Sequence, residues 1–93
     1  MEFTAKQLAK VLRGTVDGDP EAKVTSFAKI EHGKPGQLCF FANPKYEHYV
    51  YECKATILLV NKTFEPKENV SCTMIRVEDA YTAVAELLKY VSA

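Results

Sequence analysis

Two apolar stretches with a short amphipathic segment between them constrain the fold of this chain more than any other feature. ATILLVN at 55–61 is a continuous apolar run rich in branched residues, and QLCFFA at 37–42 reads as a strand buried on both faces. The segment between them predicts a short helix, with Asn43 as N-cap and Pro44 at the first helical position. This order predicts a right-handed crossover between two parallel strands.

A helix is expected near each end of the chain. Residues 3–14 begin with a capping box, in which Thr4 caps the helix and Gln7 reaches back to it. Gly14 is expected to end this helix with a positive φ. Asp79 is expected to cap the last helix. The buried stripe expected on that helix consists of Ala80, Val84, Leu87, Leu88 and Val91.

Further segments are expected to complete a sheet. Val16 suggests a short strand, residues 24–30 alternate in a strand-like way, and residues 72–77 read as another strand. HGKPG at 32–36 is a turn with two glycines and a proline. The predicted fold class is α/β, a small mixed β-sheet flanked by helices, with residues 1–93 forming a single domain.

The composition is that of a neutral globular domain. Among 93 residues, 12 are Lys or Arg and 12 are Asp or Glu, so the formal net charge is zero. A nucleic-acid-binding domain would carry a basic excess, so we expect no nucleic-acid partner. No apolar run approaches the roughly 18 residues of a transmembrane helix, which predicts no membrane span.

The cysteines and histidines predict neither a disulfide framework nor a metal site. Cys39, Cys53 and Cys72 are odd in number and widely spaced, which fits a reducing, cytoplasmic location, and the N-terminus lacks the features of a signal peptide. With His32 and His48 they show none of the paired spacing of a structural zinc site. No nucleophile, paired-carboxylate or phosphate-loop signature stands out. We therefore expect no metal, no cofactor and no catalytic residue in this chain.

Half of the aromatic side chains gather around one strand-to-helix junction. Residues 39–53 hold five of the ten Phe and Tyr residues. In a strand, Phe40 and Phe41 point to opposite faces, so only one of them faces a given layer. In the following helix, Tyr46 and Tyr49 are three residues apart and share a face. These rings are either part of the core or a platform for a flat ligand.

A ligand slot is the functional interpretation of these rings. One phenylalanine at the end of the strand and Tyr46 in the first helical turn would flank the slot, with the Asn43 carboxamide at its base. A flat heterocycle such as a nucleobase suits this arrangement, and α/β sheets bind ligands beyond the carboxyl ends of their strands. If the Asn43 oxygen caps the helix, only its amide group is left for a base.

Three runs in a fixed order carry a family resemblance. FTAKQLAKVLRGTVDGDP near the N-terminus, SFAKIEHGKPGQLCFFANPKY at 26–46 and ATILLVN resemble the N-terminal domain of UDP-3-O-(3-hydroxyacyl)glucosamine N-acyltransferase. Members of that family are enzymes of lipid A biosynthesis in Gram-negative bacteria. The resemblance covers essentially all 93 residues. It implies a uridine-nucleotide-binding domain, similar in fold to the N-terminal domains of Mur ligases and cut from a longer enzyme.

The resemblance also assigns roles within the aromatic stretch. The family's F-x-x-N-x-x-Y pattern falls on Phe40, Asn43 and Tyr46. It implies that the two rings stack around the uracil and that Asn43 makes a polar contact with it. Phe41, Lys45 and Tyr49 are expected to lie next to these three residues and to hold them in position without contacting the uracil directly.

The remainder of such an enzyme is implied to do the chemistry. Family members continue into a left-handed β-helix of hexapeptide repeats, which holds the catalytic histidine, builds the homotrimer and supplies much of the acyl-carrier-protein site. The whole enzyme is expected to transfer a 3-hydroxyacyl group from acyl carrier protein to the glucosamine amine of a UDP-linked acylglucosamine. The 93-residue chain is expected to recognise uracil, to be inactive alone and to be monomeric.

Two other functions are compatible with the same residues. The first is a Mur-ligase-like N-terminal module that binds a UDP-linked peptidoglycan precursor. The second is an interaction domain without a ligand, in which all the aromatic rings are core.

Overall fold

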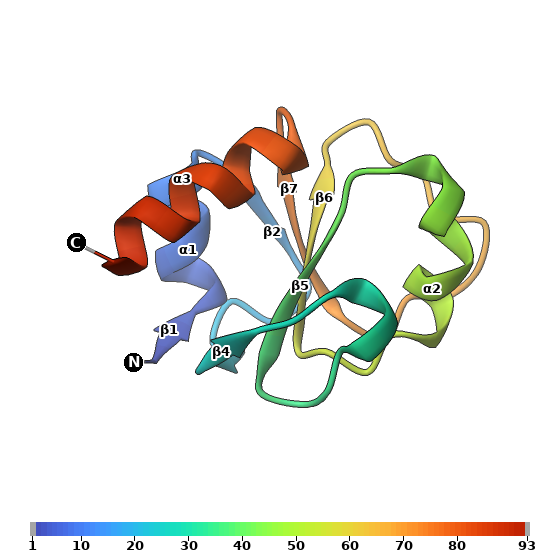
Figure 1. Cartoon of the computed structure of the whole chain (residues 1–93), viewed down its shortest axis with the longest axis horizontal. Helices are drawn as coiled ribbons and strands as arrows, with labels where there is room; N and C mark the ends of the chain where they lie inside the picture. The colour runs from blue at the N-terminus through green and yellow to red at the C-terminus, as the bar shows by residue number, and fades with distance from the viewer. Residues whose placement is uncertain (1, 93) are drawn as a thin grey trace.

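A five-stranded mixed β-sheet divides the molecule into two layers (Figure 1). The computed structural model describes residues 2–92 of the chain. The strand order is β2-β7-β6-β5-β4, in which β4 to β7 are parallel and β2 is antiparallel to β7. The strands are β2 (Thr15–Asp17), β4 (Ser26–Phe27), β5 (Gln37–Phe41), β6 (Ile57–Asn61) and β7 (Thr73–Val77). The predicted α/β class, a mixed sheet with flanking helices, is confirmed.

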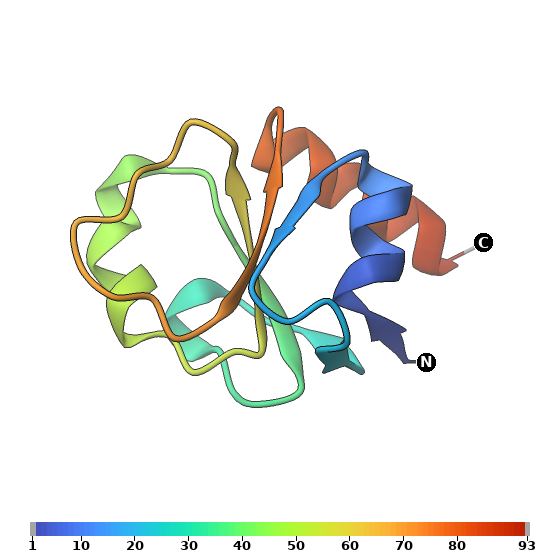
Figure 2. The same cartoon turned by 180° about the vertical axis from the view of Figure 1, so that it is seen from behind.

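Helices cover both faces of this sheet, as the two opposite views show (Figures 1 and 2). One face carries α1 (Ala5–Leu12) and α3 (Ala80–Ser92). The other face carries α2 (Glu47–Glu52) and the 3₁₀ turns η1 (Ile30–His32) and η2 (Pro44–Tyr46). A two-stranded antiparallel ribbon, β1 (Phe3–Thr4) with β3 (Lys23–Val24), adjoins the start of α1. The sheet is therefore the middle layer of the molecule.

The core is organised around β6, the central strand. Ile57, Leu58, Leu59 and Val60 are all fully buried. Because successive side chains of a strand point to opposite faces, Ile57 and Leu59 join the cluster under α1 and α3, while Leu58 and Val60 join the cluster under α2. β5 pairs in parallel with β6, so the parallel arrangement predicted for this strand–helix–strand unit is confirmed.

The capping box predicted for the first helix and the Asp79 cap predicted for the last helix are both confirmed. The Thr4 hydroxyl accepts a hydrogen bond from the Gln7 backbone N–H at 3.2 Å, and Gln7 Oε1 accepts one from the Thr4 N–H at 2.8 Å. The carboxylate of Asp79 accepts hydrogen bonds from both the N–H and the hydroxyl of Thr82 at the start of α3. Both caps satisfy backbone donors that have no partner within the helix.

Two expectations are wrong, the single strand over residues 24–30 and the burial of Leu88. Residues 24–30 do not form one strand: the extended stretch breaks after Val24, and β4 holds only two residues before η1 begins at Ile30. The short helix predicted after Asn43 is present, with Asn43 as its cap and Pro44 at its first position; its first turn is the 3₁₀ turn η2, which leads into α2. On α3, Leu88 is 52% exposed, because Ala80, Ala83 and Leu87 form the buried face and small alanines let the helix approach the sheet closely.

Gly14 has a different role from the one predicted. Arg13, and not Gly14, takes the left-handed conformation that ends α1, with φ of 59°. Gly14 instead lies so close to β7 that a β-carbon there would stand 2.7 Å from the Arg76 carbonyl oxygen and 2.8 Å from a methyl carbon of Val77. The glycine is needed for this close backbone approach and not for a positive φ.

No helix among residues 2–92 is both long enough and apolar enough to cross a membrane.

The two adjacent positions at the end of α1 should respond oppositely to substitution. Gly14→Ala should lower the free energy of unfolding by about 1–3 kcal/mol, because the new methyl group overlaps the β7 backbone. Arg13→Gly should leave it unchanged or raise it by up to about 1 kcal/mol, because a left-handed conformation strains a non-glycine residue. Urea unfolding of both variants measures this difference, and equal destabilisation by the two would contradict it.

Candidate functional site

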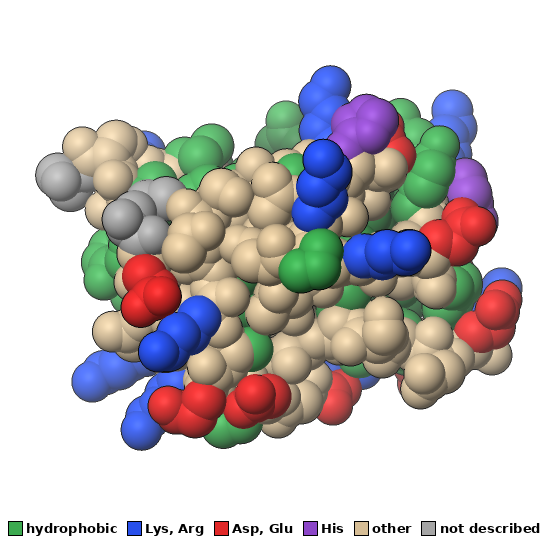
Figure 3. Space-filling view, turned by 90° about the horizontal axis from the view of Figure 1, so that it is seen from below, with side chains coloured by type: hydrophobic (Ala, Val, Ile, Leu, Met, Phe, Trp, Pro, Cys, Tyr) green, Lys and Arg blue, Asp and Glu red, His purple; other side chains and the backbone are tan. Residues whose placement is uncertain are grey.

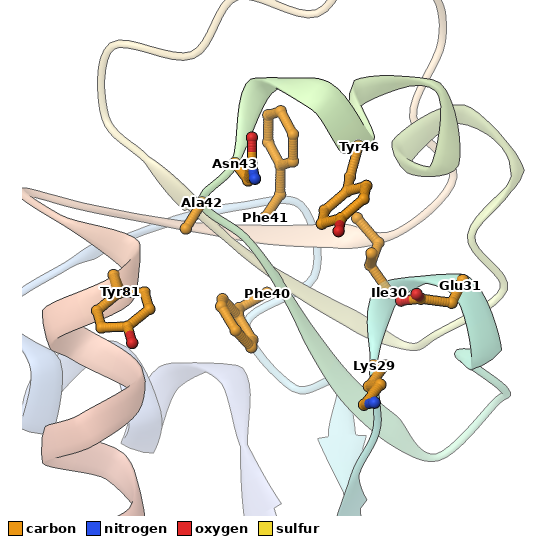
Figure 4. Close-up of a pocket in the computed structure, with 9 residues that line it drawn as sticks. All are labelled: Lys29, Ile30, Glu31, Phe40, Phe41, Ala42, Asn43, Tyr46 and Tyr81. Atoms are coloured by element: carbon orange, nitrogen blue, oxygen red, sulfur yellow. The ribbon is translucent and has the colours of Figure 1, made fainter.

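A pocket of about 430 Å³ opens at the carboxyl ends of β4 and β5 (Figure 4). Its walls come from three parts of the chain: residues 29–31 after β4, residues 40–43 at the end of β5 together with Tyr46 of η2, and Tyr81 in the first turn of α3. The helix that follows β5 lies on one face of the sheet and the helix that follows β7 on the other. The pocket thus lies where the connections diverge to opposite faces, the usual ligand position in open α/β sheets.

The two phenylalanines of β5 have different environments. Phe41 is 8% exposed and packs edge-on against Phe64, with ring centroids 5.0 Å apart, on the α2 side of the sheet. Phe40 is half-buried and points to the opposite face, toward the side of Tyr81 in Figure 4. Although both touch the pocket, Phe40 is the one whose ring is available to a ligand, while Phe41 is fixed in the core.

Asn43 joins the strand to the helix and divides its side chain between two tasks. Its Oδ1 accepts a hydrogen bond from the Lys45 N–H at 3.0 Å, which makes it the cap of η2. Pro44 follows at the first position of the turn, where its missing N–H costs nothing. Among the residues that the structure describes, the Asn43 Nδ2 has no hydrogen-bond partner, and the residue is exposed at the pocket. This side chain therefore has both Nδ2 protons free to donate to a ligand, while one lone pair of its Oδ1 is already used by the cap.

Tyr46 projects from η2 over Ile30 and supplies the second ring of the pocket (Figure 4). It is 44% exposed. Tyr49 lies one turn further on, outside the pocket lining, with its ring centroid 6.0 Å from that of Tyr46. Lys45 lines a separate, shallow depression on the surface of α2. Of the three supporting residues expected from the sequence, only Phe41 borders the pocket, while Tyr49 backs the Tyr46 ring.

Sequence reasoning missed the walls contributed by other segments. Lys29, Ile30 and Glu31 follow β4, and Tyr81 begins α3, far from the aromatic stretch along the chain. Tyr81 is 70% exposed, which is unusual for an aromatic side chain on a helix that packs on a sheet. A search for exposed aromatics just after the carboxyl ends of parallel strands would have found it.

The electrostatic character of the site is mixed. Lys29 and Glu31 bring one charge of each sign to the pocket rim, so the rim has no net preference for an anion. The face seen from below in Figure 3 likewise intersperses Lys and Arg with Asp and Glu. Within residues 2–92, no group of three His, Cys, Asp or Glu side chains is arranged to hold a metal ion. Phe40 and Tyr46 offer ring stacking, and Asn43 offers a neutral hydrogen-bond donor, which suits the binding of a flat ligand.

The two phenylalanines should be separable by their cost to stability. Phe41→Ala should lower the free energy of unfolding by about 3–5 kcal/mol, because it leaves a cavity beside Phe64. Phe40→Ala should cost about half of that or less, since the ring is only half-buried. Chemical unfolding measures both, and a larger loss for Phe40→Ala would contradict the assignment of Phe40 to the open pocket.

Comparison with known proteins places the chain beside one set of enzymes. A family model described as UDP-3-O-(3-hydroxymyristoyl) glucosamine N-acyltransferase matches residues 21–90. Curated proteins named UDP-3-O-acylglucosamine N-acyltransferase match as well. The one from Porphyromonas gingivalis strain W83 is 52% identical over 93 residues, which is 100% of this chain and 27% of that protein.

Relatives from other bacteria give the same result. A protein of the same name from Phocaeicola vulgatus is 51% identical over 88 residues, 95% of this chain and 25% of the relative. Another from Christiangramia forsetii is 48% identical over 90 residues, 97% of this chain and 26% of the relative. The chain spans about a quarter of the length of the curated relatives that it matches.

Proposed function

The chain belongs to the UDP-3-O-acylglucosamine N-acyltransferase family, and we propose that it is the N-terminal domain that recognises the uracil of the UDP-linked substrate. The observation that carries the proposal is the pocket at the carboxyl end of β5, where Phe40, Asn43 and Tyr46 meet. These are the positions of the F-x-x-N-x-x-Y pattern. The pocket lining and the sequence pattern point to the same three residues.

The three side chains divide the recognition of a pyrimidine between them. Phe40 and Tyr46 both line the pocket, so each offers a ring against which a flat base can stack. Since the Asn43 Oδ1 is held by the Lys45 N–H, the Nδ2 is the group directed to the base. Uracil presents carbonyl oxygens on its edge, and these accept from an amide donor.

The affinity of this domain for a uridine nucleotide is expected to be weak. Stacking contributes about 1–3 kcal/mol per base, and a neutral hydrogen bond adds about 0.5–1.5 kcal/mol. Association costs at least about 4 kcal/mol, which offsets most of this gain, so we expect a dissociation constant of about 1 mM or weaker. The charges of Lys29 and Glu31 at the pocket rim have opposite signs. We therefore expect the diphosphate to add little to the binding free energy at this pocket.

In the whole protein we place this domain in lipid A biosynthesis. The remainder of the enzyme would transfer a 3-hydroxyacyl group from acyl carrier protein to the glucosamine amine of a UDP-linked acylglucosamine, and would form the homotrimer. The present chain would contribute substrate recognition in the cytoplasm, remain monomeric and have no activity alone. The family match favours this role over a Mur-ligase-like module or an interaction domain without a ligand. Likeness to the fold of Mur ligase N-terminal domains stays a prediction.

Substitutions of Asn43 separate its cap from its contact with the base. Asn43→Asp keeps an oxygen that accepts from the Lys45 N–H, but it replaces the Nδ2 donor by a second acceptor. The free energy of unfolding should therefore stay unchanged, while the dissociation constant for UDP should rise at least about tenfold. Asn43→Ala should weaken binding as much and also cost about 1 kcal/mol of unfolding free energy. Ligand-detected NMR with UDP measures the first effect and urea unfolding the second. Unchanged UDP binding by Asn43→Asp would sink the proposed contact.

Tyr46 has a matched control on the same domain. Tyr46→Ala should weaken UDP binding by about five- to 150-fold, the loss of one stacking partner worth about 1–3 kcal/mol. Tyr90 is equally exposed, at 44%, but lies near the end of α3 and outside the pocket lining. Tyr90→Ala should leave the dissociation constant for UDP unchanged. Equal effects of the two substitutions would mean that Tyr46 has no specific role.

A further inference from the structure

The three cysteines of the chain converge in the layer between the sheet and α2. Cys39 lies in the middle of β5, Cys53 directly follows α2, and Cys72 directly precedes β7. All three thiols are free, and the residues are 0%, 4% and 6% exposed respectively. They belong to one apolar cluster, which we call the thiol cluster. Neither the proposed uracil site nor the family match gives these side chains a role.

Gly33, just after η1, shows how closely two of the sulfurs approach. A β-carbon on Gly33 would stand 2.7 Å from the Cys39 Sγ and 3.0 Å from the Cys53 Sγ, so both sulfurs flank the same point. The Cys72 Sγ lies 3.5 Å from the Cys53 carbonyl oxygen. Cys53 is therefore the member of the thiol cluster that contacts both of the others.

The sheet register excludes direct pairing of the two outer cysteines. Cys39 pairs across β5 and β6 with Leu58, and Leu58 pairs across β6 and β7 with Met74. Cys72 is two residues before Met74, so a whole strand separates it from Cys39. Two strand spacings amount to about 10 Å, beyond the Cα separation of about 4.4–6.8 Å that a disulfide spans. Any disulfide within the thiol cluster must then include Cys53.

The thiol cluster also has an internal order of acidity. The neighbouring thiols, Cys39 first and then Cys72, lower the pKa of the Cys53 thiol, against the opposing effect of its burial. The same contacts with Cys53, together with burial, raise the pKa of Cys39 and of Cys72. Since the thiolate is the reactive form, this order adds to the geometry, in which Cys53 is the member of the thiol cluster that contacts both of the others.

We propose that the thiol cluster is an oxidation site, in which Cys53 reacts with a peroxide and then forms a disulfide with either Cys39 or Cys72. The Cys53 sulfur attacks the O–O bond, takes one oxygen as a sulfenic acid and releases water when the oxidant is hydrogen peroxide. The neighbouring thiol then attacks this sulfur and displaces a second water. Two thiols lose two electrons in total, and these reduce the peroxide. The third thiol can exchange with the disulfide by attacking the Cys53 sulfur.

Pairing of Cys39 would reach the wall of the pocket. In the reduced protein the Cys39 thiol donates to the Lys29 carbonyl oxygen at 3.5 Å, and residues 29–31 line the pocket. A disulfide between Cys39 and Cys53 removes this donor. Because Gly33 packs against the same two sulfurs, shortening their separation also moves the η1 segment. The expected consequence is a change around residues 29–33 that needs no nucleotide to be observed.

Peroxide treatment of the folded chain, followed by disulfide mapping by mass spectrometry, tests the proposal. Wild-type protein should lose two of its three thiols, and every intramolecular disulfide should contain Cys53. Cys53→Ala should form none, whereas Cys39→Ala and Cys72→Ala should each form the one remaining pair. Circular dichroism checks that each variant folds. In the Cys72→Ala variant, where the only possible pair is Cys39 with Cys53, the amide NMR signals of residues 29–33 should shift on oxidation and return on reduction.

Several results would overturn the proposal. A folded wild-type protein that keeps all three thiols, a disulfide between Cys39 and Cys72, or a disulfide in the Cys53→Ala variant would each do so. No nucleotide is present in these measurements, so their failure would leave the uracil assignment untouched, and failure of UDP binding would leave the thiol cluster untouched.

Discussion

Burial of β6 on both faces is the constraint on which the rest of the structure depends. A strand whose side chains are fully buried on both sides needs a layer of packing above and below the sheet. α1 and α3 supply one layer, and α2 with the two 3₁₀ turns supplies the other. Since the parallel strands end at one edge, the connections to these layers diverge there. The pocket is a consequence of that divergence and not of a dedicated binding loop.

The site uses the alternation of a strand to give two neighbouring rings separate tasks. Phe41 points into the α2 layer and anchors the strand against Phe64, which leaves Phe40 on the other face beside the opening. The chain then turns at Asn43, whose oxygen starts η2 and whose amide nitrogen stays available. Tyr46 follows in that same turn. β5 and η2 therefore hold the pocket residues in place before a ligand binds. This lowers the entropy that the protein side chains lose on binding.

Features that depend on nearby residues could be predicted from the sequence. The Thr4–Gln7 capping box and the Asn43 cap are bonds within three residues, and the parallel pairing of β5 with β6 follows from two apolar runs with a short helix between them. The predicted ligand residues Phe40, Asn43 and Tyr46 were found together because they lie within seven residues of one another. The role of each toward uracil stays a prediction.

Features set by contacts between distant segments could not be predicted in this way. Gly14 is required by the Arg76 carbonyl oxygen, 62 positions further along the chain, and Tyr81 reaches the pocket only because α3 returns over the sheet. The three cysteines looked unrelated by spacing, yet the fold brings them into one apolar cluster, with Cys39 and Cys53 against Gly33. The extended stretch at residues 24–30 is interrupted after Val24, where β3 pairs with β1 near the N-terminus. No local sequence pattern predicts this pairing.

An amide NMR titration of the chain with UDP-N-acetylglucosamine, carried into the millimolar range, tests the central claim most directly. An adenosine nucleotide serves as the control for the phosphates. The account predicts shifts concentrated at residues 29–31, 40–43 and Tyr46, half-saturating at about 1 mM or above, with little effect of the adenosine nucleotide at those positions. Shifts confined to other surfaces, or equal shifts with both nucleotides, would contradict a uracil site at the carboxyl end of β5.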